Sequence, residues 1–257
     1  MSSRLATTPF LELRGVSKHY GAVQALMDVD LDIHRGQVLG LLGDNGAGKS
    51  TLIKTIAGVV VASAGSVRCN GKEVFLSSPE IARGFGIETV FQDLALIPNL
   101  SVASNFFLGR EMTMLSRNGL LGLLQRHKME KEVIETLKKL DIHIPSVKVA
   151  VDELSGGQKQ AVAIARATHW KANLVIMDEP TAALSVPEQK KVLALARQLA
   201  SDGVAVIYIT HNILDVVEVT DRIVVLHRGR KAAEVLTADT NEHEIISMIM
   251  GKTARSP

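Results

Sequence analysis

The chain has 257 residues, of which 46% are hydrophobic and 22% charged, and a formal net charge of +2. This composition allows a sizeable core and excludes a disordered protein, and the small net charge gives no argument for nucleic-acid binding. The single cysteine, Cys69, excludes an internal disulfide framework and suggests a reducing compartment. No stretch approaches the roughly 18 apolar residues of a membrane span, and residues 1–9 are expected to form a flexible tail without the features of a signal peptide. We therefore expect a soluble intracellular protein with one large domain, or one domain with an inserted lobe, whose membrane role would come through a partner.

Two stretches near the N-terminus alternate apolar and polar residues, which predicts strands with one buried face, as in an antiparallel sheet. They are Phe10–Arg14 and the stretch that contains Leu31 and Ile33. Tyr20 lies between them, ahead of a glycine-rich segment. It either stacks on the adenine of a nucleotide or caps the core from a turn, and the residue taken alone favours the second alternative.

The most specific pattern in the chain is G-x-x-x-x-G-K-[ST], a phosphate-binding loop (P-loop). A short apolar run at Val38–Leu42 predicts a buried parallel strand before it. A helix-forming stretch at Thr51–Ala57 follows, with Gly58 as a C-terminal stop. Strand, loop and helix are the context that the pattern needs, which argues against a chance match. The eight residues of the pattern are Gly43, Asp44, Asn45, Gly46, Ala47, Gly48, Lys49 and Ser50.

This loop is suited to the phosphates of a nucleotide. Its glycines let the backbone curl so that N–H groups point at phosphate oxygens, and the helix N-terminus adds a partial positive charge. Lys49 can reach the terminal phosphates, and the hydroxyl of Ser50 can hold Mg²⁺.

The segment after the first helix predicts two further pieces of sheet. Gly65–Gly71 is expected to form a hairpin edge that turns at Asn70-Gly71. Ile87–Phe91 is expected to be a strand that ends at Gln92-Asp93. A polar pair at the C-terminal end of a strand lies where open α/β sheets bind ligands, although a solvated strand end explains it equally well.

From about residue 94 to residue 151 helical periodicity replaces the apolar strand-like runs, which predicts an inserted helical subdomain at about residues 94–165. Leu120–Leu124 adds a short apolar cluster. Phe106 and Phe107 are expected in the core of this lobe, and a surface groove for a partner helix is the less favoured alternative. Four residues are expected to share one helix face: Val133, Ile134, Leu137 and Leu140.

Residues 154–158 read Leu-Ser-Gly-Gly-Gln. Ser155 and Gln158 have the spacing of a capping box, so the segment is expected to open a helix. Gly156 and Gly157 lower the helix propensity of the first turn, but they leave its backbone N–H groups accessible to an anion. The alternatives are a well-capped helix and a second helix N-terminus that faces a phosphate.

Two more buried strands are predicted, and each ends at residues that can do chemistry. Leu174–Met177 ends in Asp178-Glu179, where Asp178 fits a Mg²⁺ ligand and Glu179 fits a base that orients attacking water. Val204–Ile209 ends close to His211. A lone histidine is usually structural, but one at the tip of a core strand is a candidate to contact a phosphate.

The C-terminal third predicts two helices and a hairpin. Ser185 and Glu188 have capping-box spacing and are expected to open a helix that runs to about Leu199. Ile223–Leu226 is expected to be a strand with Lys231–Leu236 as its hairpin partner. Residues 242–250 are expected to form a docked helix, and residues 252–257 a frayed tail. The helix carries Ile245, Ile246 and Ile249 for docking.

Taken in this order, the motifs resemble those of the nucleotide-binding subunit of an ABC transporter over about residues 10–251. The Leu-Ser-Gly-Gly-Gln signature is the specific part, because P-loop kinases and small GTPases do not carry it. The resemblance implies an α/β fold, with a P-loop NTPase core on a mixed parallel sheet, an N-terminal antiparallel β-subdomain and the inserted helical subdomain. It also implies an ATPase with ATP and Mg²⁺ as cofactors.

The resemblance assigns a role to each motif residue. Glu179, His211 and Gln92 are expected to be catalytic. Ser50, Gln92 and Asp178 are expected to hold Mg²⁺. Tyr20 matches the family's adenine-stacking aromatic. The remaining nucleotide contacts are expected from Gly43, Asp44, Asn45, Gly46, Ala47, Gly48, Lys49, Ser50 and Thr51 in the loop, and from Ser155, Gly156, Gly157 and Gln158 in the signature.

Within that family the chain is most similar to simple-sugar importers of the ribose, xylose and fructose type, through residues 43–50, 86–96, 107–111 and 250–251. The resemblance implies a homodimer that closes head to tail on ATP, multi-span permease subunits and, indirectly, a solute-binding protein. It implies a peripheral position at the cytoplasmic side of the cell membrane, without nucleic acid.

The chain departs from its relatives in two ways. It has one ATPase domain where many such importers fuse two, and it has Ser185 where many ABC proteins carry aspartate, which removes the carboxylate of the usual cross-dimer contact. Two alternatives stay open: an importer of amino acids or other solutes, and a soluble ABC ATPase that acts on ribosomes or DNA.

Overall fold

The computed structural model describes residues 8–114 and 122–251. Its larger sheet has the strand order β12-β11-β3-β10-β9-β6. The strands from β11 to β6 run parallel, and β12 pairs antiparallel with β11 at one edge, so the predicted mixed sheet and its hairpin are confirmed. The bounds are Val38–Leu42 for β3, Ile87–Val90 for β6, Leu174–Asp178 for β9, Ala205–Ile209 for β10, Arg222–His227 for β11 and Arg230–Leu236 for β12.

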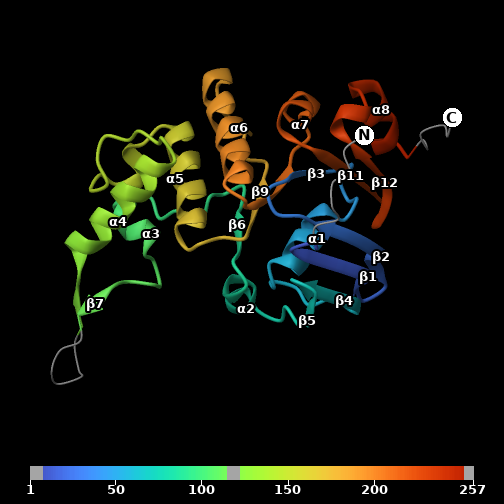
Figure 1. Ribbon diagram of the computed structural model, residues 1–257, viewed down its shortest axis with the longest axis horizontal. Coiled ribbons are helices and arrows are strands. Elements are labelled where there is room, and N and C mark those ends of the chain that lie inside the picture. Colours follow the sequence, from blue (N-terminus) through green and yellow to red (C-terminus); the bar gives the residue numbers. More distant parts are fainter. Residues whose placement is uncertain (1–7, 115–121, 252–257) are drawn as a thin grey trace.

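The central strands are apolar because both faces of the sheet are covered (Figure 1). In β10, Val206 and Tyr208 belong to the core on the side of α6 (Val186–Ser201), whereas Ile207 belongs to the core on the side of α1 (Lys49–Ile56). Parallel pairing brings the C-terminal ends of β3, β6, β9 and β10 to one edge of the sheet. This edge is where such sheets bind ligands.

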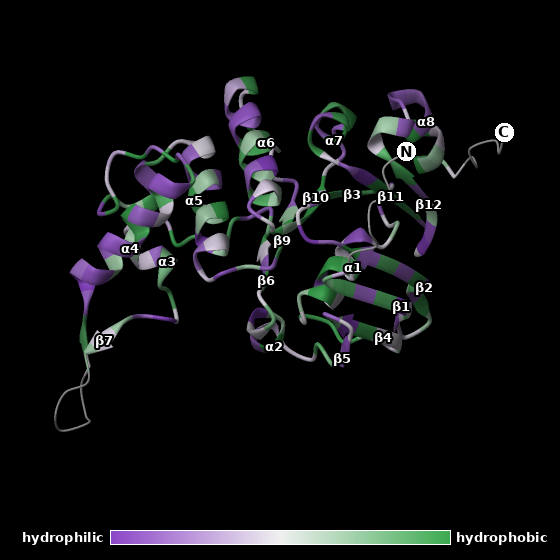
Figure 2. Ribbon diagram, viewed as in Figure 1, coloured by the Kyte–Doolittle hydropathy of each residue, from purple (hydrophilic) through white to green (hydrophobic). Residues whose placement is uncertain are grey.

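A second, antiparallel sheet has the order β2-β1-β4-β5 and packs on the α1 side. Its strands alternate apolar and polar residues (Figure 2), as predicted for sheets with one buried face. Left-handed backbone at Asn70 and Gly71 makes the predicted turn. β1 continues through Tyr20, so this residue ends a strand and does not lie in a loop between two strands. The bounds are Leu11–Tyr20 for β1, Val23–Ile33 for β2, Ala64–Cys69 for β4 and Lys72–Val74 for β5.

The helices begin and end close to their sequence signals. α1 starts at Lys49, two residues before the predicted start, and ends before Gly58, whose φ is 71°. Ser185 is the N-cap of α6, as its capping box predicts. The other helices of the core are α2 (Pro79–Gly84), α7 (Ile213–Val219) and α8 (Glu242–Ile249).

The terminal helix α8 docks on β11 and α7, but one predicted contact is wrong. Ile245 is buried, whereas Ile246 is 36% exposed. Met248 takes the inward position, because residues three apart share a helix face. The predicted tails at residues 1–9 and 252–257 lie outside the described residues, apart from Thr8 and Pro9.

A group of helices at one end of the molecule contains α3 (Val102–Phe106), α4 (Arg126–Lys139) and α5 (Gly156–His169). Phe106 and Phe107 are buried in its core, as predicted. Ile134 is 52% exposed, contrary to prediction, and Met129 shares the buried face of α4 instead. The limits of the helical subdomain at residues 94–165 stay a prediction, since α5 continues unbroken to His169.

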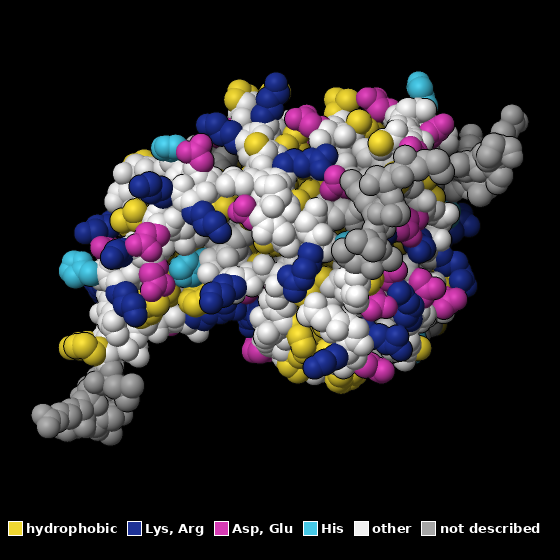
Figure 3. Space-filling view, viewed as in Figure 1, with side chains coloured by type: hydrophobic (Ala, Val, Ile, Leu, Met, Phe, Trp, Pro, Cys, Tyr) yellow, Lys and Arg dark blue, Asp and Glu magenta, His cyan; other side chains and the backbone are white. Residues whose placement is uncertain are grey.

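The described part of the predicted apolar cluster at Leu120–Leu124 does not belong to this helical core. Leu123–Leu124 forms the short strand β8, which pairs with β7 (Thr113–Met114), and its side chains are exposed. Residues 120 and 121 lie outside the described residues. Among the described helices, none is long and apolar enough to cross a membrane. Acidic and basic side chains are interspersed over the face in Figure 3, which agrees with the small net charge.

Candidate functional site

The P-loop between β3 and α1 depends on glycine. Gly43, Gly46 and Gly48 have φ values of 149°, 79° and 104°. A Cβ on Gly43 would lie 2.4 Å from the carbonyl oxygen of Leu226, and one on Gly48 would lie 2.7 Å from the carbonyl oxygen of Ala25. The loop backbone is therefore packed tightly against β11 and β2, while its middle residues are exposed.

Lys49 lies over this loop. Its Nζ donates hydrogen bonds to the carbonyl oxygens of Gly43 at 2.6 Å and Asp44 at 3.2 Å. Ser50 and Thr51 follow in the first turn of α1, where backbone N–H groups have no partner within the helix. An ammonium group and a free helix N-terminus together favour an anion such as a phosphate.

Asp178 ends β9 and pairs with Ile209 at the end of β10. Burial and, after it, the charge of Glu179 raise the pKa of Asp178, while the ammonium of Lys49 lowers it. The P-loop lysine and the strand-end carboxylate are thus close enough to interact. Two neighbouring carboxylates in a half-buried position are costly, and a divalent cation would relieve that cost.

Glu179 has a left-handed backbone with φ 51°, fixed by a 2.8 Å hydrogen bond from its N–H to the carbonyl oxygen of Ile209. This places it beside His211, whose Nδ1 lies 3.0 Å from Oε2 of Glu179. The contact is not aligned as a hydrogen bond, so within the described residues this buried oxygen has no donor. A carboxylate at the end of a core strand, beside a histidine, suits a base that orients water.

Gln92 follows β6, is exposed, and lines an open hollow with Asp178. The backbone after it is left-handed at Leu94 and Ala95. Arg166 of α5 donates hydrogen bonds to both of their carbonyl oxygens, at 2.9 and 2.6 Å. Arg166, which the sequence patterns did not single out, thereby ties the segment after Gln92 to the helix that begins at the signature.

Two buried polar networks were also not predicted. Asn105 accepts a 2.7 Å hydrogen bond from the N–H of Ile97 and donates to its carbonyl oxygen. Thr181 donates a 2.6 Å hydrogen bond to the carboxylate of buried Asp215 and accepts one from the hydroxyl of Tyr208. These networks fix the segments that follow Gln92 and Glu179. A polar residue inside an apolar stretch is the only sequence signal for such a network, and it does not reveal the distant partner.

The signature lies at the start of α5 and not at the strand ends. Oγ of Ser155 accepts a hydrogen bond from the N–H of Gln158 at 3.3 Å, and Oε1 of Gln158 accepts one from the N–H of Ser155 at 3.0 Å. The predicted capping box is confirmed. Because α5 packs on α3, α4, α6 and β6, well away from α1 in Figure 1, the fold does not bring the signature to the P-loop of the same chain.

Tyr20 does not cap the core. Its side chain is 46% exposed, and Nζ of Lys18 lies 5.1 Å from the centre of its ring. The alternative that the residue alone favoured is therefore wrong, and the ring is accessible for stacking.

The donor set predicted for Mg²⁺ fits that ion. It consists of the hydroxyl of Ser50, the amide of Gln92 and the carboxylate of Asp178, and Mg²⁺ prefers oxygen ligands completed by water and phosphate. Within residues 8–114 and 122–251, no group of three or more His, Cys, Asp or Glu side chains is placed to hold a metal.

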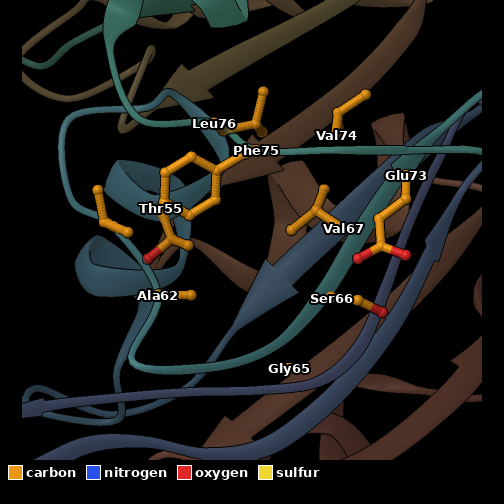
Figure 4. Close-up of a pocket in the computed structure, with 10 residues that line it drawn as sticks. Thr55, Ala62, Gly65, Ser66, Val67, Glu73, Val74, Phe75 and Leu76 are labelled. Carbon is orange, nitrogen blue, oxygen red and sulfur yellow. The ribbon is translucent and has the colours of Figure 1, made fainter.

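A separate pocket of about 230 Å³ lies between the last turn of α1 and the β4–β5 hairpin. Figure 4 shows Thr55, Phe75 and Glu73 among its lining residues. It lies at the opposite end of α1 from the P-loop, so it is not part of the candidate nucleotide site.

Comparison with known proteins identifies close relatives. The model of the ABC transporter family matches residues 26–182. The chain is 49% identical to the xylose/arabinose import ATP-binding protein XylG of Sulfolobus acidocaldarius, over 93% of each chain. It is 42% identical to the fructose import ATP-binding protein FrcA of Rhizobium meliloti, over 96% of each chain. It is 39% identical to the ribose import ATP-binding protein RbsA 1 of Streptomyces avermitilis, over 95% of this chain but 45% of that protein.

Solved structures agree with the sequence relatives. A nucleotide-free ATP-binding cassette of an ABC transporter aligns with a TM-score of 0.76 and 25% identity, over 94% of this chain and 95% of that chain. A cassette in its ADP conformation aligns with a TM-score of 0.78 and 26% identity, over 95% and 96% of the two chains. The predicted α/β P-loop fold is confirmed.

Proposed function

The chain belongs to the family of ABC transporter ATP-binding proteins and is an ATPase, and we propose that it energises uptake of a monosaccharide through partner permease subunits. Three relatives are named for xylose/arabinose, fructose and ribose import, which supports a sugar over an amino acid. The observation that carries the proposal is that the P-loop, Asp178-Glu179 and His211 follow strands whose C-terminal ends share one edge of a sheet.

The proposed nucleotide contacts follow from this arrangement. The P-loop N–H groups, Lys49 and the α1 N-terminus would bind the phosphates, with Ser50 and Thr51 in the first helical turn. Tyr20 would stack on the adenine. Ser50, Gln92 and Asp178 would hold Mg²⁺, which supplies charge neutralisation at the phosphates when it is bound.

Glu179 is the proposed base. Its carboxylate, at the end of β9, would accept a hydrogen bond from the attacking water and orient it toward the γ-phosphate. His211 is largely exposed beside this carboxylate and would contact the γ-phosphate. Gln92, at the end of β6, would contact Mg²⁺ and the attacking water. Catalysis by these residues is mostly positioning and charge stabilisation, as for phosphoryl transfer in general.

The signature belongs to a second copy of the chain in this proposal. Ser155, Gly156, Gly157 and Gln158 form a helix N-terminus far from their own P-loop, and they would close on the γ-phosphate held by the partner. Two equivalent sites then form across a two-fold axis. A dimer of a bacterial ABC transporter cassette has been solved, with 26% identity and a TM-score of 0.73 over 88% of this chain and 98% of that chain, which supports a dimer.

The proposed partners follow from the same arrangement. When the dimer closes, the group of helices α3, α4 and α5 would transmit the motion to multi-span permease subunits through the surface between Gln92 and Phe107. A solute-binding protein would act on the far side of the membrane. The ATPase would be a peripheral subunit at the cytoplasmic face. Arg166 supports the coupling, because it ties the segment after Gln92 to α5.

Two experiments test the proposal. Glu179→Gln should form an ATP-dependent dimer in size-exclusion chromatography, and Ser155→Arg in that background should abolish the dimer while monomer ATP binding persists, since a bulky cation replaces a small hydroxyl. Ser201→Arg, at the exposed end of α6, is the control. A dimer that survives Ser155→Arg contradicts the head-to-tail arrangement. Deletion of the gene should abolish uptake of labelled xylose, arabinose, fructose or ribose, and loss of amino-acid uptake alone would contradict sugar import.

A further inference from the structure

Glu188 in the first turn of α6 reaches the signature. Its Oε1 accepts a hydrogen bond from Oγ of Ser155 at 3.2 Å and one from the N–H of Gly157 at 3.1 Å. Its Oε2 accepts hydrogen bonds from the N–H and Oγ of Ser185 at 3.1 and 2.7 Å. One carboxylate thus joins the N-terminus of α5 to the segment that follows Glu179.

The carboxylate is an anion in this position. The hydroxyl and the N–H of Ser185, followed by the N–H of Gly157, lower the pKa of Glu188. Hydrogen bonds to the charged form stabilise it, so Glu188 is ionised at neutral pH. A negative charge therefore occupies the positive end of the α5 macrodipole.

The contact is built into the packing. A Cβ on Gly157 would lie 2.6 Å from Cγ and from Oε1 of Glu188, so the second glycine of the signature makes room for this side chain. The capping box of α6 needs one oxygen of Glu188 at most, which leaves the other for α5. The sequence pattern predicted the box at Ser185 but not the contact with Ser155 and Gly157.

In the proposed function, on which this inference rests, each ATP site combines the P-loop of one chain with the signature of its partner. We propose that Glu188 is a positioning residue of this shared site, because its carboxylate and the γ-phosphate held by the partner compete for the hydroxyl of Ser155 and the N–H of Gly157. Closure on ATP then requires Oε1 of Glu188 to leave these donors, while Oε2 stays with Ser185. Because Oε2 stays bonded to Ser185, this exchange of partners makes dimer formation depend on the position of residues 180–185, which begin directly after Glu179. Glu188 thereby lowers the affinity of the dimer for ATP and links closure to the segment that carries the base.

The test measures the MgATP concentration that gives half-maximal dimer by analytical ultracentrifugation, with the full chain in the Glu179→Gln background. Glu188→Gln removes the charge at nearly constant shape. Because charge-assisted hydrogen bonds are each stronger than neutral ones, the Gln variant should dimerise at a roughly tenfold lower concentration. Ser185→Ala, which loosens the carboxylate without removing its charge, should give a smaller shift in the same direction. Glu218→Gln, in an exposed residue at the far end of α7, is the charge-matched control and should change nothing.

The outcomes separate this proposal from the proposed function. ATP binding to the monomer should be unchanged in Glu188→Gln, because the P-loop is not touched. If Glu188 only stabilised α5, its replacement would raise the ATP concentration needed and lower the melting temperature, and that result overturns competition. An unchanged concentration overturns it as well. If the Glu179→Gln chain fails to dimerise with MgATP both with and without Glu188→Gln, the proposed function fails and this inference fails with it.

Discussion

Gly48→Ala separates two physical costs inside the P-loop. The residue has φ 104°, and a Cβ would lie 2.7 Å from the carbonyl oxygen of Ala25 and 3.0 Å from Cδ2 of buried Leu26. Gly46 offers a matched control, because its φ of 79° also disfavours alanine but a Cβ there has no atom within 4 Å among the neighbours described. Gly46→Ala therefore measures backbone strain alone, and Gly48→Ala measures strain plus collision.

The expected magnitudes follow from these contacts. Strained backbone at one residue costs about 1–3 kcal/mol, and forcing extra atoms into a packed site costs about 1–3 kcal/mol. We expect Gly46→Ala to lose about 1 kcal/mol of unfolding free energy and Gly48→Ala about 2–4 kcal/mol. For a chain of this size 1 kcal/mol corresponds to roughly 2–4 °C, so Gly48→Ala should melt roughly 4–16 °C below the parent chain.

The assay is thermal unfolding followed by circular dichroism without nucleotide, with binding of a fluorescent ATP analogue measured in parallel. Gly48→Ala should also weaken ATP binding more than Gly46→Ala, because relief of the collision moves the loop away from β2. If the two variants have the same melting temperature, the packing of Gly48 against Ala25 does not stabilise the loop, and the geometric reasoning is wrong.

Three further predictions concern the charged groups. Lys49→Ala should weaken ATP binding by a factor on the order of 10²–10⁴, because the phosphates lose the charge-assisted hydrogen bonds that Lys49 would donate, while Lys138→Ala at the exposed end of α4 leaves it unchanged in an equilibrium titration. Glu179→Gln should bind MgATP but hydrolyse it slower by a factor on the order of 10²–10⁴, and phosphate release within a few-fold of the parent rate would point to another base. Asp178→Asn should raise the melting temperature at neutral pH, because it removes a carboxylate whose pKa is raised by burial and by Glu179. A raised pKa destabilises the fold as pH rises, so this gain should shrink toward about pH 4, and a gain that is constant with pH would refute its origin in the charge.

The local parts of the fold were predictable because their signals are local. Apolar runs of strand length gave the central strands, and glycine at defined positions gave the P-loop and the hairpin at Asn70-Gly71. Capping boxes located the starts of α5 and α6. The predictions of buried residues were wrong where the periodicity of apolar residues does not settle which face of a helix is covered. Ile134 and Ile246 fit an apolar stripe, but the neighbours that cover α4 and α8 select Met129 and Met248 instead.

The sequence patterns named the residues of the candidate site but not the contacts between them. The patterns named Glu179 and His211 separately, and only the pairing of β9 with β10 brings them to 3.0 Å. The same holds for Arg166 and the carbonyl oxygens after Gln92, which are more than 70 residues apart in the chain. Such partners leave no periodic signal, because their proximity depends on how several elements pack.

The sequence by itself determined which groups are available for chemistry: a glycine-rich loop with a lysine, a capped helix with two glycines in its first turn, and carboxylates and a histidine at strand ends. Each of these is encoded within a few consecutive residues, where backbone conformation and capping act directly. The tertiary structure decided which of these groups can meet. Parallel strand order gathers Lys49, Asp178, Glu179 and His211 at one edge of the sheet, whereas packing of α5 on α6 places Ser155 elsewhere, against Glu188. Proximity in a folded chain depends on the topology and packing of distant segments, and a local pattern carries no information about it.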